Sequence, residues 1–284
     1  IPLDQMSSLS AARPHVFMPE NRLVSLGSHD LAIHPSLSDF KSFFNEDRLK
    51  IIQNVGYSTP DFSHFRSMDI WSTGMTNISD TRGWLGRYLD SVYPNYPNDY
   101  PNVANPDPFA ISMGSEVSST WQGLMSNFSN AINDPFAAVN LLNTGATNDG
   151  TYFGSHLEYL SILINQTNQY AATINTAANA GSSLSTLYDV NNPLAMQLRN
   201  VAKMISGGLK TKVYILNING FDTHDAQVDA NNTMIGNHAD LLKRLSDAIS
   251  AFQNDIGLLG ISNRVAGLTF SEFGRKAKEN GSLG

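Results

Sequence analysis

The sequence lacks cysteine and has few charged residues. None of its 284 residues is Cys, which excludes disulfides, thiolate zinc sites and cysteine nucleophiles. Only 15% of the residues are Asp, Glu, Lys or Arg, the formal net charge is -7, and Lys and Arg form no cluster. Nucleic-acid partners are therefore not expected, because phosphate backbones favour basic patches. The abundant Asn, Ser and Thr residues predict a polar, weakly charged surface.

Long apolar runs are missing as well. No stretch reaches the roughly 20 apolar residues that a membrane-spanning helix needs, so no membrane span is expected. The chain begins at Ile1 rather than at Met and shows no secretory leader. We expect this start to be a processed or trimmed end from which a leader has been removed. The lack of cysteine also suits an exported protein.

The residues that are present predict a globular chain of ordinary core size. The hydrophobic fraction is 41%, and a chain of this length can form one large domain or a core with an inserted lobe. A stretch rich in Pro, Asn and Tyr, "YPNYPNDYPNVANPDP", indicates a loop or linker in the first half. We interpret the chain as one composite α/β domain made of residues 1–93, a variable and mainly helical insertion at 94–210, and residues 211–284.

Apolar periodicity predicts the main elements. Amphipathic or long helical patterns occur at 36–47, from about 63 onward, at 81–93, 154–180, 192–208 and 232–259. Buried strands are predicted at 48–56, 211–220 and 264–275, with a short strand at 109–114. The order of strand, helix and strand from 211 to 275 predicts a parallel pair joined by a right-handed crossover.

Polar residues follow each of the three predicted buried strands. Asp222 and His224 come after the strand at 211–220, and Glu272 lies at the end of the last one. Ligands of open parallel sheets bind beyond the carboxyl ends of the strands, and neighbouring strands lie ~4.8 Å apart. We therefore expect these side chains to converge. Carboxylates and imidazoles suit zinc, manganese or iron, and carboxylate-rich sites also suit magnesium or calcium, so Asp222, His224 and Glu272 are candidate ligands of a divalent metal.

A further polar cluster, with Ser63, His64 and Arg66, follows the strand predicted at 48–56. Ser63 is a candidate nucleophile, because a metal lowers the pKa of a hydroxyl that it binds. Arg66 or Arg275 could hold an anionic oxygen of the substrate. Ser63, His64, Arg66 and Arg275 are therefore the candidate catalytic residues.

Each of these residues also has a purely structural interpretation. Asp222 could be a turn residue whose carboxylate caps the next segment. Glu272 and Arg275 could form a structural ion pair. Ser63 could be the N-cap of a helix that carries His64 and Arg66. The functional interpretation depends on the coincidence of three polar clusters with the ends of three predicted strands.

Several stretches, taken in order, resemble the bacterial domain-of-unknown-function family 1501. They are "LAIHPSLSDFKSFFNEDRLKIIQNVGY", "SHFRSMDIWSTG", "GWLGRYLD", "NGFDTHDAQ", "LLKRLSDAISAFQNDI" and "LTFSEFGRKAKENGSLG". The resemblance covers residues 1–90 and 211–284. Family members usually have a Gly-Gly-Asn-Asp-type segment before the position of Ile1 and a Thr-Asp-His-Gly-type segment after "ENGSLG". We therefore expect the chain to be trimmed at both ends.

The resemblance implies a fold and a chemistry. The family is grouped with the alkaline-phosphatase-like superfamily of metal-dependent phosphatases, sulfatases and phosphomutases, which implies a three-layer α/β/α core. It implies Asp222 and His224 as metal ligands and Glu272 as a ligand or a supporting carboxylate. Ser63 and His64 are similar to the segment where related enzymes place a nucleophile. With ligand segments outside the chain, any metal bound here is expected to be partial, weak or absent, since zinc takes about four ligands. A twin-arginine leader, common in the family, implies a periplasmic or secreted location.

Two main functions remain open on the sequence alone. The first is an exported metal-dependent hydrolase of phosphate or sulfate esters, with a small-molecule or glycan ester as substrate. The second is a non-catalytic periplasmic or surface protein that binds a glycan or a partner on the same scaffold. The Tyr- and Asn-rich loop near residue 100 suits glycan contact. A phosphomutase-like transfer would require a phosphorylated Ser63. The substrate and the oligomeric state are not predicted.

Overall fold

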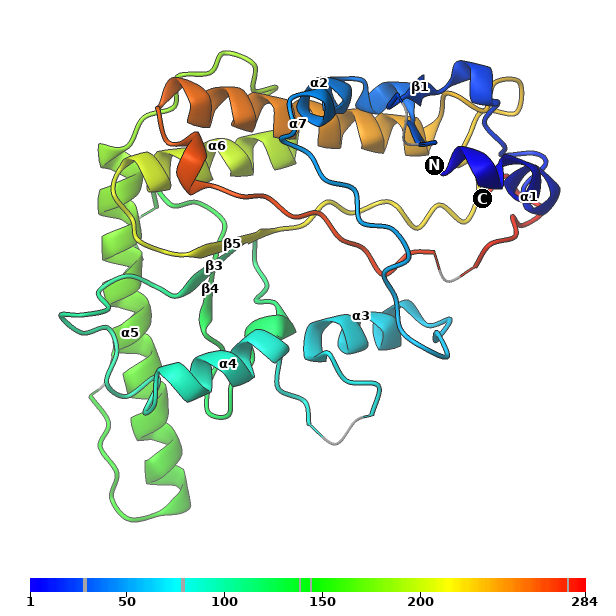
Figure 1. The fold of residues 1–284 in the computed structure, drawn as a ribbon. Helices are drawn as coiled ribbons and strands as arrows, with labels where there is room; N and C mark the ends of the chain where they lie inside the picture. The colour runs from blue at the N-terminus through cyan, green and yellow to red at the C-terminus, as the bar shows by residue number, and fades with distance from the viewer. Residues whose placement is uncertain (28–29, 78–79, 138, 144, 275) are drawn as a thin grey trace.

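The computed structural model describes residues 1–27, 30–77, 80–137, 139–143, 145–274 and 276–284. It is an α/β structure built around a small parallel sheet (Figure 1). The sheet consists of β3 (Ala110–Met113), β4 (Ser129–Ile132) and β5 (Val213–Leu216), in the order β4-β3-β5. Both pairings are parallel, and Ala110 lies opposite Ser129 on one side and Val213 on the other.

Helices account for most of the remaining regular structure. They are α1 (Met6–Ala12), α2 (Asp39–Asn45), α3 (His64–Thr73), α4 (Trp84–Val92), α5 (Tyr152–Ala180), α6 (Pro193–Ser206) and α7 (Asn237–Leu258). A small antiparallel pair joins β1 (Val24–Ser25) to β2 (Ala32–Ile33), and short 3-10 turns occur at Leu3–Gln5, Glu20–Arg22, Pro35–Leu37, Ser119–Trp121 and Ser262–Arg264. Every helix predicted from the periodicity is present, with ends shifted by a few residues. In the part of the chain that the structure describes, no helix is long and apolar enough to cross a membrane.

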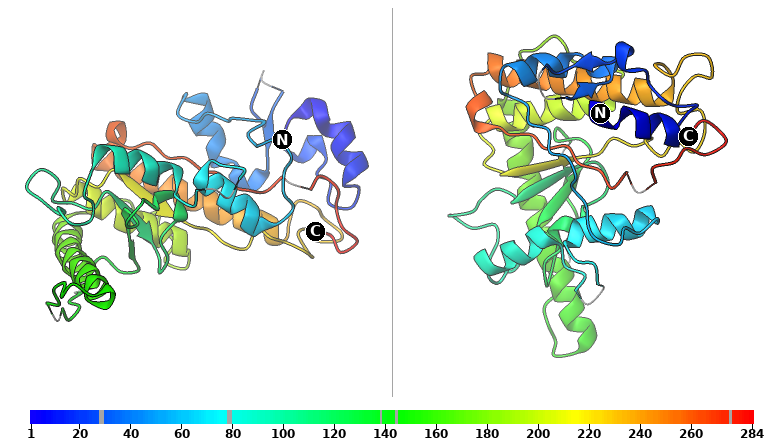
Figure 2. Two further views of the ribbon diagram at one scale, coloured as in Figure 1. Left: turned by 90° about the horizontal axis from the view of Figure 1, so that it is seen from below. Right: turned by 45° about the vertical axis from the view of Figure 1, so that its right-hand side comes forward.

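The core lies on both faces of the sheet, because side chains alternate along a strand. On one face, Ile111 and Met113 pack against α5, α6 and α7 through Tyr170, Ile174, Val201, Met204, Phe252 and Ile256. On the other face, Ala110 joins a cluster with Leu89 of α4, Tyr96, Trp121 and Phe128. The N-terminal half of α5 extends beyond the sheet, as Figure 2 shows from two further sides.

The aromatic side chains of the loop after α4 pack in the hydrophobic core. The ring of Tyr96 stacks on Phe128 at 4.2 Å between centroids and is only 6% exposed. Tyr93 and Tyr100 pack on Phe109 at 4.1 and 5.6 Å. The three tyrosine rings therefore pack against other rings, and the glycan contact suggested for this loop stays a prediction.

Two of the predicted strands are wrong. Residues 48–56 form no strand, and neither do the described residues of 264–275. Both segments are exposed, with Ile52 at 75% and Leu268 at 80%. Their apolar runs indicate an extended chain but do not define a hydrogen-bonding partner, and β5 pairs instead with β3. The predicted parallel pair between 211–220 and 264–275 is therefore wrong as well.

The segment 94–210 contributes more to the sheet than its pattern indicates. It contains the helices α5 and α6, as predicted, and β3 lies within the short strand predicted at 109–114. It also contains β4, which apolar periodicity did not predict because Ser129 and Asn130 make the strand half polar. Two of the three strands thus come from this segment, and they pair with β5 from residues 211–284.

A buried carboxylate on α7 binds the segment that connects α5 to α6. Asp255 of α7 has no exposed surface. It accepts hydrogen bonds from the backbone N–H groups of Leu184 and Ser185, at 2.6 and 3.0 Å, and from the hydroxyls of Ser183 and Tyr188, at 2.8 and 3.0 Å. Four donors compensate the cost of burying this charge, which identifies Asp255 as a structural residue.

Candidate functional site

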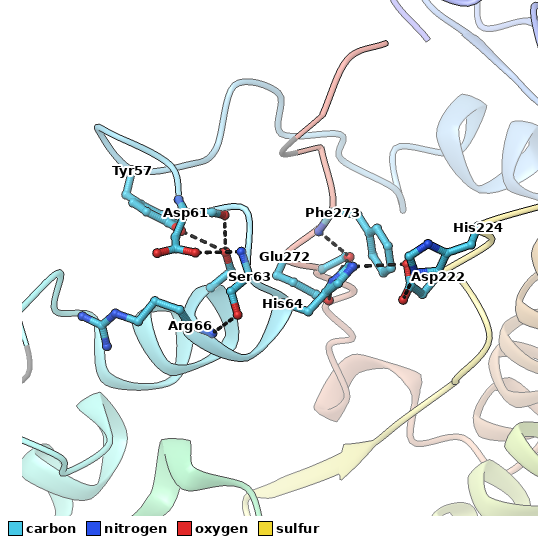
Figure 3. A network of polar contacts seen from close by, with 11 residues as sticks. Tyr57, Asp61, Ser63, His64, Arg66, Asp222, His224, Glu272 and Phe273 are labelled. Atoms are coloured by element: carbon cyan, nitrogen blue, oxygen red, sulfur yellow. Dashed lines mark hydrogen bonds and ion pairs between the residues drawn. The ribbon is translucent and has the colours of Figure 1, made fainter. Parts of the chain in front are cut away.

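Three segments that are distant in the sequence bring two imidazoles and two carboxylates together (Figure 3). His64 Nδ1 lies 2.9 Å from Glu272 Oε1, and His64 Nε2 lies 3.2 Å from Asp222 Oδ1. The other oxygen of Asp222, Oδ2, lies 2.9 Å from His224 Nε2. The result is a continuous chain of contacts from Glu272 through His64 and Asp222 to His224, which we call the acid–imidazole cluster. The predicted convergence of these side chains is confirmed.

His64 is placed by the way in which α3 begins. Ser63 is the N-cap of α3, and its hydroxyl oxygen accepts a hydrogen bond from the backbone N–H of Arg66 at 3.4 Å. The backbone N–H of Ser63 in turn donates to Asp61 Oδ1 at 2.7 Å. These contacts fix the first turn of α3, so that His64, its first residue, projects toward the loop that follows β5.

The loop that carries Asp222 and His224 is held by the last residues of the chain. The backbone N–H groups of Ala226 and Gln227 donate to the carbonyls of Ser282 and Leu283, at 3.1 and 2.8 Å. The side-chain amide of Asn280 donates to the carbonyl of His224 at 2.5 Å. Ala226 adopts a positive φ of 46°, which is unusual for a residue with a Cβ. These hydrogen bonds therefore stabilise a loop conformation that the chain would otherwise disfavour.

The exposed fraction of the side chains increases along the cluster from Glu272 to His224. The side chain of Glu272 is 14% exposed and that of His64 is 28% exposed, whereas Asp222 is 51% and His224 80% exposed. Burial opposes the ionisation of Asp222, but the hydrogen bond from His224 and the positive charge on the imidazoles outweigh it and lower the pKa of Asp222. Asp222 is therefore expected to stay ionised over the whole range in which a histidine titrates.

Not every predicted site residue belongs to the cluster. The guanidinium of Arg66 donates to the carbonyl of Thr76 at 2.7 Å and points away from His64 (Figure 3). The structure supports Ser63 as an N-cap, and its hydroxyl serves the helix backbone rather than the imidazole. Arg275, the other predicted clamp, lies outside the described residues. Neither Ser63 nor Arg66 therefore contacts the acid–imidazole cluster through its hydroxyl or guanidinium in the contacts described here, and their roles as nucleophile and clamp stay predictions.

Sequence reasoning missed two neighbours of the cluster. The ring of Phe273 lies edge-on against His64, with 4.8 Å between ring centroids. Asn280 reaches the loop as described above. The signal for Phe273 was its position directly after Glu272. No pattern in the sequence points to Asn280, because its partner is a backbone carbonyl.

The donor set has the chemistry of a metal site but not the arrangement of one. Carboxylates and imidazoles are ordinary ligands of divalent metals. Here, however, Glu272 and Asp222 lie at opposite ring nitrogens of His64, so these donors bind one another. Within the described ranges, no group of three His, Cys, Asp or Glu side chains is placed to share one ion. Asp222, His224 and Glu272 as they lie therefore do not form a resident metal site.

The cluster is an open surface site. One hollow in the surface lies beside Gly207 and Gly208, and a groove runs between α2 and α7 along Ser42 and Gln253. None of the four cluster residues lines either of them. His224 and Asp222 are the most exposed members of the cluster, so a ligand would reach the cluster at these two residues.

Comparison with known proteins identifies the family. No curated protein matches the chain, and neither does any solved structure. One family model, described as "Protein of unknown function (DUF1501)", matches residues 21–284 and so includes the segment 94–210. This match spans most of the chain, and the protein therefore belongs to the DUF1501 family.

Proposed function

We propose that this protein is a hydrolase of phosphate or sulfate esters, with the acid–imidazole cluster as its acid–base centre. The observation that supports the proposal is the chain of contacts at 2.9, 3.2 and 2.9 Å that links Glu272, His64, Asp222 and His224. Residues from three distant segments form it, and its exposed end can be reached from solvent. Histidine paired with a carboxylate is the most common general acid–base unit in enzymes.

His224 has the position of a general base. Its Nε2 faces Asp222, and a carboxylate can only accept, so Nε2 carries the proton and the lone pair resides on Nδ1. Among the described residues, Nδ1 of His224 has no hydrogen-bond partner. In the proposed reaction, this nitrogen takes a proton from the water that attacks the phosphorus or sulfur atom. The ester bond to the leaving oxygen then breaks, and that oxygen is protonated from solvent.

His64 lies between the two carboxylates of the cluster. Both of its ring nitrogens face carboxylate oxygens, and both can donate only when the ring is an imidazolium. In its imidazolium form, His64 offsets the negative charge of one of the two carboxylates. This reduces the repulsion that an anionic ester would meet at the cluster.

Three further points of the proposal do not depend on the acid–base step: a bound divalent metal, membership of the alkaline-phosphatase-like superfamily, and export from the cytoplasm. We propose that a divalent cation at this site takes ligands in addition to Asp222, His224 and Glu272. We also propose an alkaline-phosphatase-like fold, with which the α/β architecture agrees at a coarse level, and a periplasmic or secreted location.

Hydrolysis of aryl phosphates and aryl sulfates by the purified protein tests the proposal. The assay is run across pH after treatment with a chelator and again with added zinc, manganese, magnesium or calcium. Asp222→Asn is expected to lower kcat/KM at least about 100-fold, because the imidazole of His224 loses its orienting partner. Asp225→Asn, an exposed carboxylate in the same loop, is the matched control and should retain the activity of the unaltered protein.

Two outcomes contradict the proposal. Equal activity in Asp222→Asn and Asp225→Asn would show that the cluster is not the reacting centre. No turnover of either ester class, with or without metal, would favour the non-catalytic binding function instead.

A further inference from the structure

Apolar side chains continue from the cluster along one face of α3. Met68 and Trp71 follow His64 at intervals of four and three residues, which places them on the same side of the helix. Phe273 packs edge-on against His64 at 4.8 Å, and Phe270 stacks on Trp71 at 6.2 Å. The segment 270–273 therefore runs along α3 in the opposite direction. We call Met68, Trp71, Phe270 and Phe273 the apolar strip.

The strip is open to solvent although Phe270 stacks on Trp71. Met68 is 40% exposed, Phe273 is 43% exposed and Phe270 is 62% exposed. Large apolar side chains gathered on a surface mark an interaction site. Phe273 lies against His64 and Phe270 lies against Trp71, and these two positions on α3 are seven residues apart, which corresponds to a length of ~10 Å.

The strip and the cluster share residues of the same two segments. His64 and Met68 both belong to α3, and Glu272 and Phe273 are neighbours in the chain. A molecule that places a polar head group on the cluster therefore has an apolar surface directly beside that head group. An ester of the proposed substrate class that carries an apolar group would place its two ends on these two surfaces.

We propose that the apolar strip is the binding subsite for the apolar group of an amphiphilic ester, an aryl or alkyl chain up to ~10 Å long. This inference rests on the proposed function, because it names the substrate class of the same site. The head group would contact His224, the exposed end of the cluster, and the chain would lie along Phe273 and Phe270 toward Trp71. A small hydrophilic ester would use only the cluster and bind more weakly.

Binding of alkylphosphonates to the intact protein tests this inference without turnover, because their carbon–phosphorus bond is not an ester bond. Methyl-, butyl- and octylphosphonate are titrated by calorimetry near pH 6, where histidines are partly protonated. Affinity should rise at least about tenfold from methyl to octyl, since apolar area is buried along the strip. Phe270→Ala should remove most of that gain while leaving methylphosphonate binding unchanged.

The matched control is Phe65→Ala. Phe65 is also on α3 and is 86% exposed, but it lies about 100° around the helix from His64. It should leave the dependence on chain length intact. Octylamine, which carries the opposite charge, should bind at least about tenfold more weakly than octylphosphonate.

Each remaining outcome has a defined meaning. Affinity that is independent of chain length, or a gain that Phe270→Ala does not reduce, would overturn the inference. So would octylamine binding as tight as octylphosphonate, or a dimer in solution that Phe270→Ala dissociates, because a second copy would then cover the strip. Ester hydrolysis without any chain-length effect would leave the proposed function standing and sink only this subsite. Phosphonate binding that depends on Phe270, without hydrolysis of any ester, would support the apolar subsite and contradict the proposed hydrolase function.

Discussion

Asp222 holds the cluster together, because its two carboxylate oxygens contact two different imidazoles. Partial burial raises its pKa, but the hydrogen bond from His224 and the charge of the imidazoles lower it by more, so the net pKa lies below the ordinary value of 3.8. A carboxylate whose folded-state pKa is depressed stabilises the fold above its unfolded pKa, and this contribution is lost as the pH falls through the folded pKa. The contacts of Asp222 should therefore persist at neutral pH and weaken only below about pH 4.

The pKa of Asp222 gives a prediction at this scale. His224→Ala should raise the pKa of Asp222, because it removes the largest of the effects that lower it. The carboxyl carbon of Asp222, followed by NMR from pH 2 to 7, measures this change. His156→Ala, which removes an imidazole from α5, is the control and should leave the titration unaltered. A pKa of Asp222 that is the same in both variants would show that its contact with His224 does not exist in solution.

How well the sequence predicts single residues depends on what each residue contacts. The contacts of His64, Asp222, His224 and Glu272 join side chains, and residue type and position indicated them. Ser63 was open to two interpretations, and its contact with the backbone N–H of Arg66 supports the structural one. Asn280 acts on a backbone carbonyl, and such partners have no signature in residue type.

Among the elements, the helices could be predicted and much of the sheet could not. The helices α5, α6 and α7 have long apolar faces and local hydrogen bonds, so their periodicity defines them. A strand needs a partner that may lie far along the chain. The apolar run at 48–56 has no partner, whereas the half-polar β4 has one in β3.

Two glycines at helix ends give an element-scale prediction. A Cβ on Gly207, at the end of α6, would lie 1.8 Å from the carbonyl oxygen of Ala177 in α5. The φ of Gly207 is -78°, so the close approach of the two helices, and not backbone strain, requires glycine here. Gly207→Ala should lower the free energy of unfolding by about 1–3 kcal/mol, as overpacking does.

Gly257 provides the matched control within α7. A Cβ there would meet nothing within 4 Å, and alanine favours a helix more than glycine does. Gly257→Ala should therefore raise the free energy of unfolding by about 0.5–1 kcal/mol. Urea unfolding of both variants measures the two effects, and changes of the same sign would contradict the close packing of α5 on α6.

For the whole molecule, the sequence predicted the right convergence for a partly wrong reason. The three polar clusters were predicted to lie at the ends of neighbouring strands, but of the three strands predicted before them only the one that contains β5 is part of the sheet. His64 arrives instead through the N-cap of α3, and Glu272 through an extended segment whose Phe270 stacks on Trp71. Long-range placement of this kind depends on tertiary contacts between separate segments, which local patterns do not contain.

The last residues of the chain hold the site from a distance of more than 50 residues in sequence, which gives a prediction for the molecule as a whole. Deleting residues 280–284 removes the contacts of Asn280, Ser282 and Leu283 with the loop at 222–227, while the helices around the sheet keep all of their packing. Hydrogen exchange measured by NMR should therefore show faster exchange at the amides of Ala226 and Gln227, by at least about tenfold, because local opening no longer breaks these bonds. Amides of α6 and α7 in the core should exchange at their original rates and serve as the internal control.

The pKa of Asp222 in the shortened chain should also shift upward, since a mobile loop no longer keeps Asp222 beside His64. Unchanged protection of Ala226 and Gln227 would mean that the loop holds its conformation by itself, and the end of the chain would then have no part in positioning the acid–imidazole cluster.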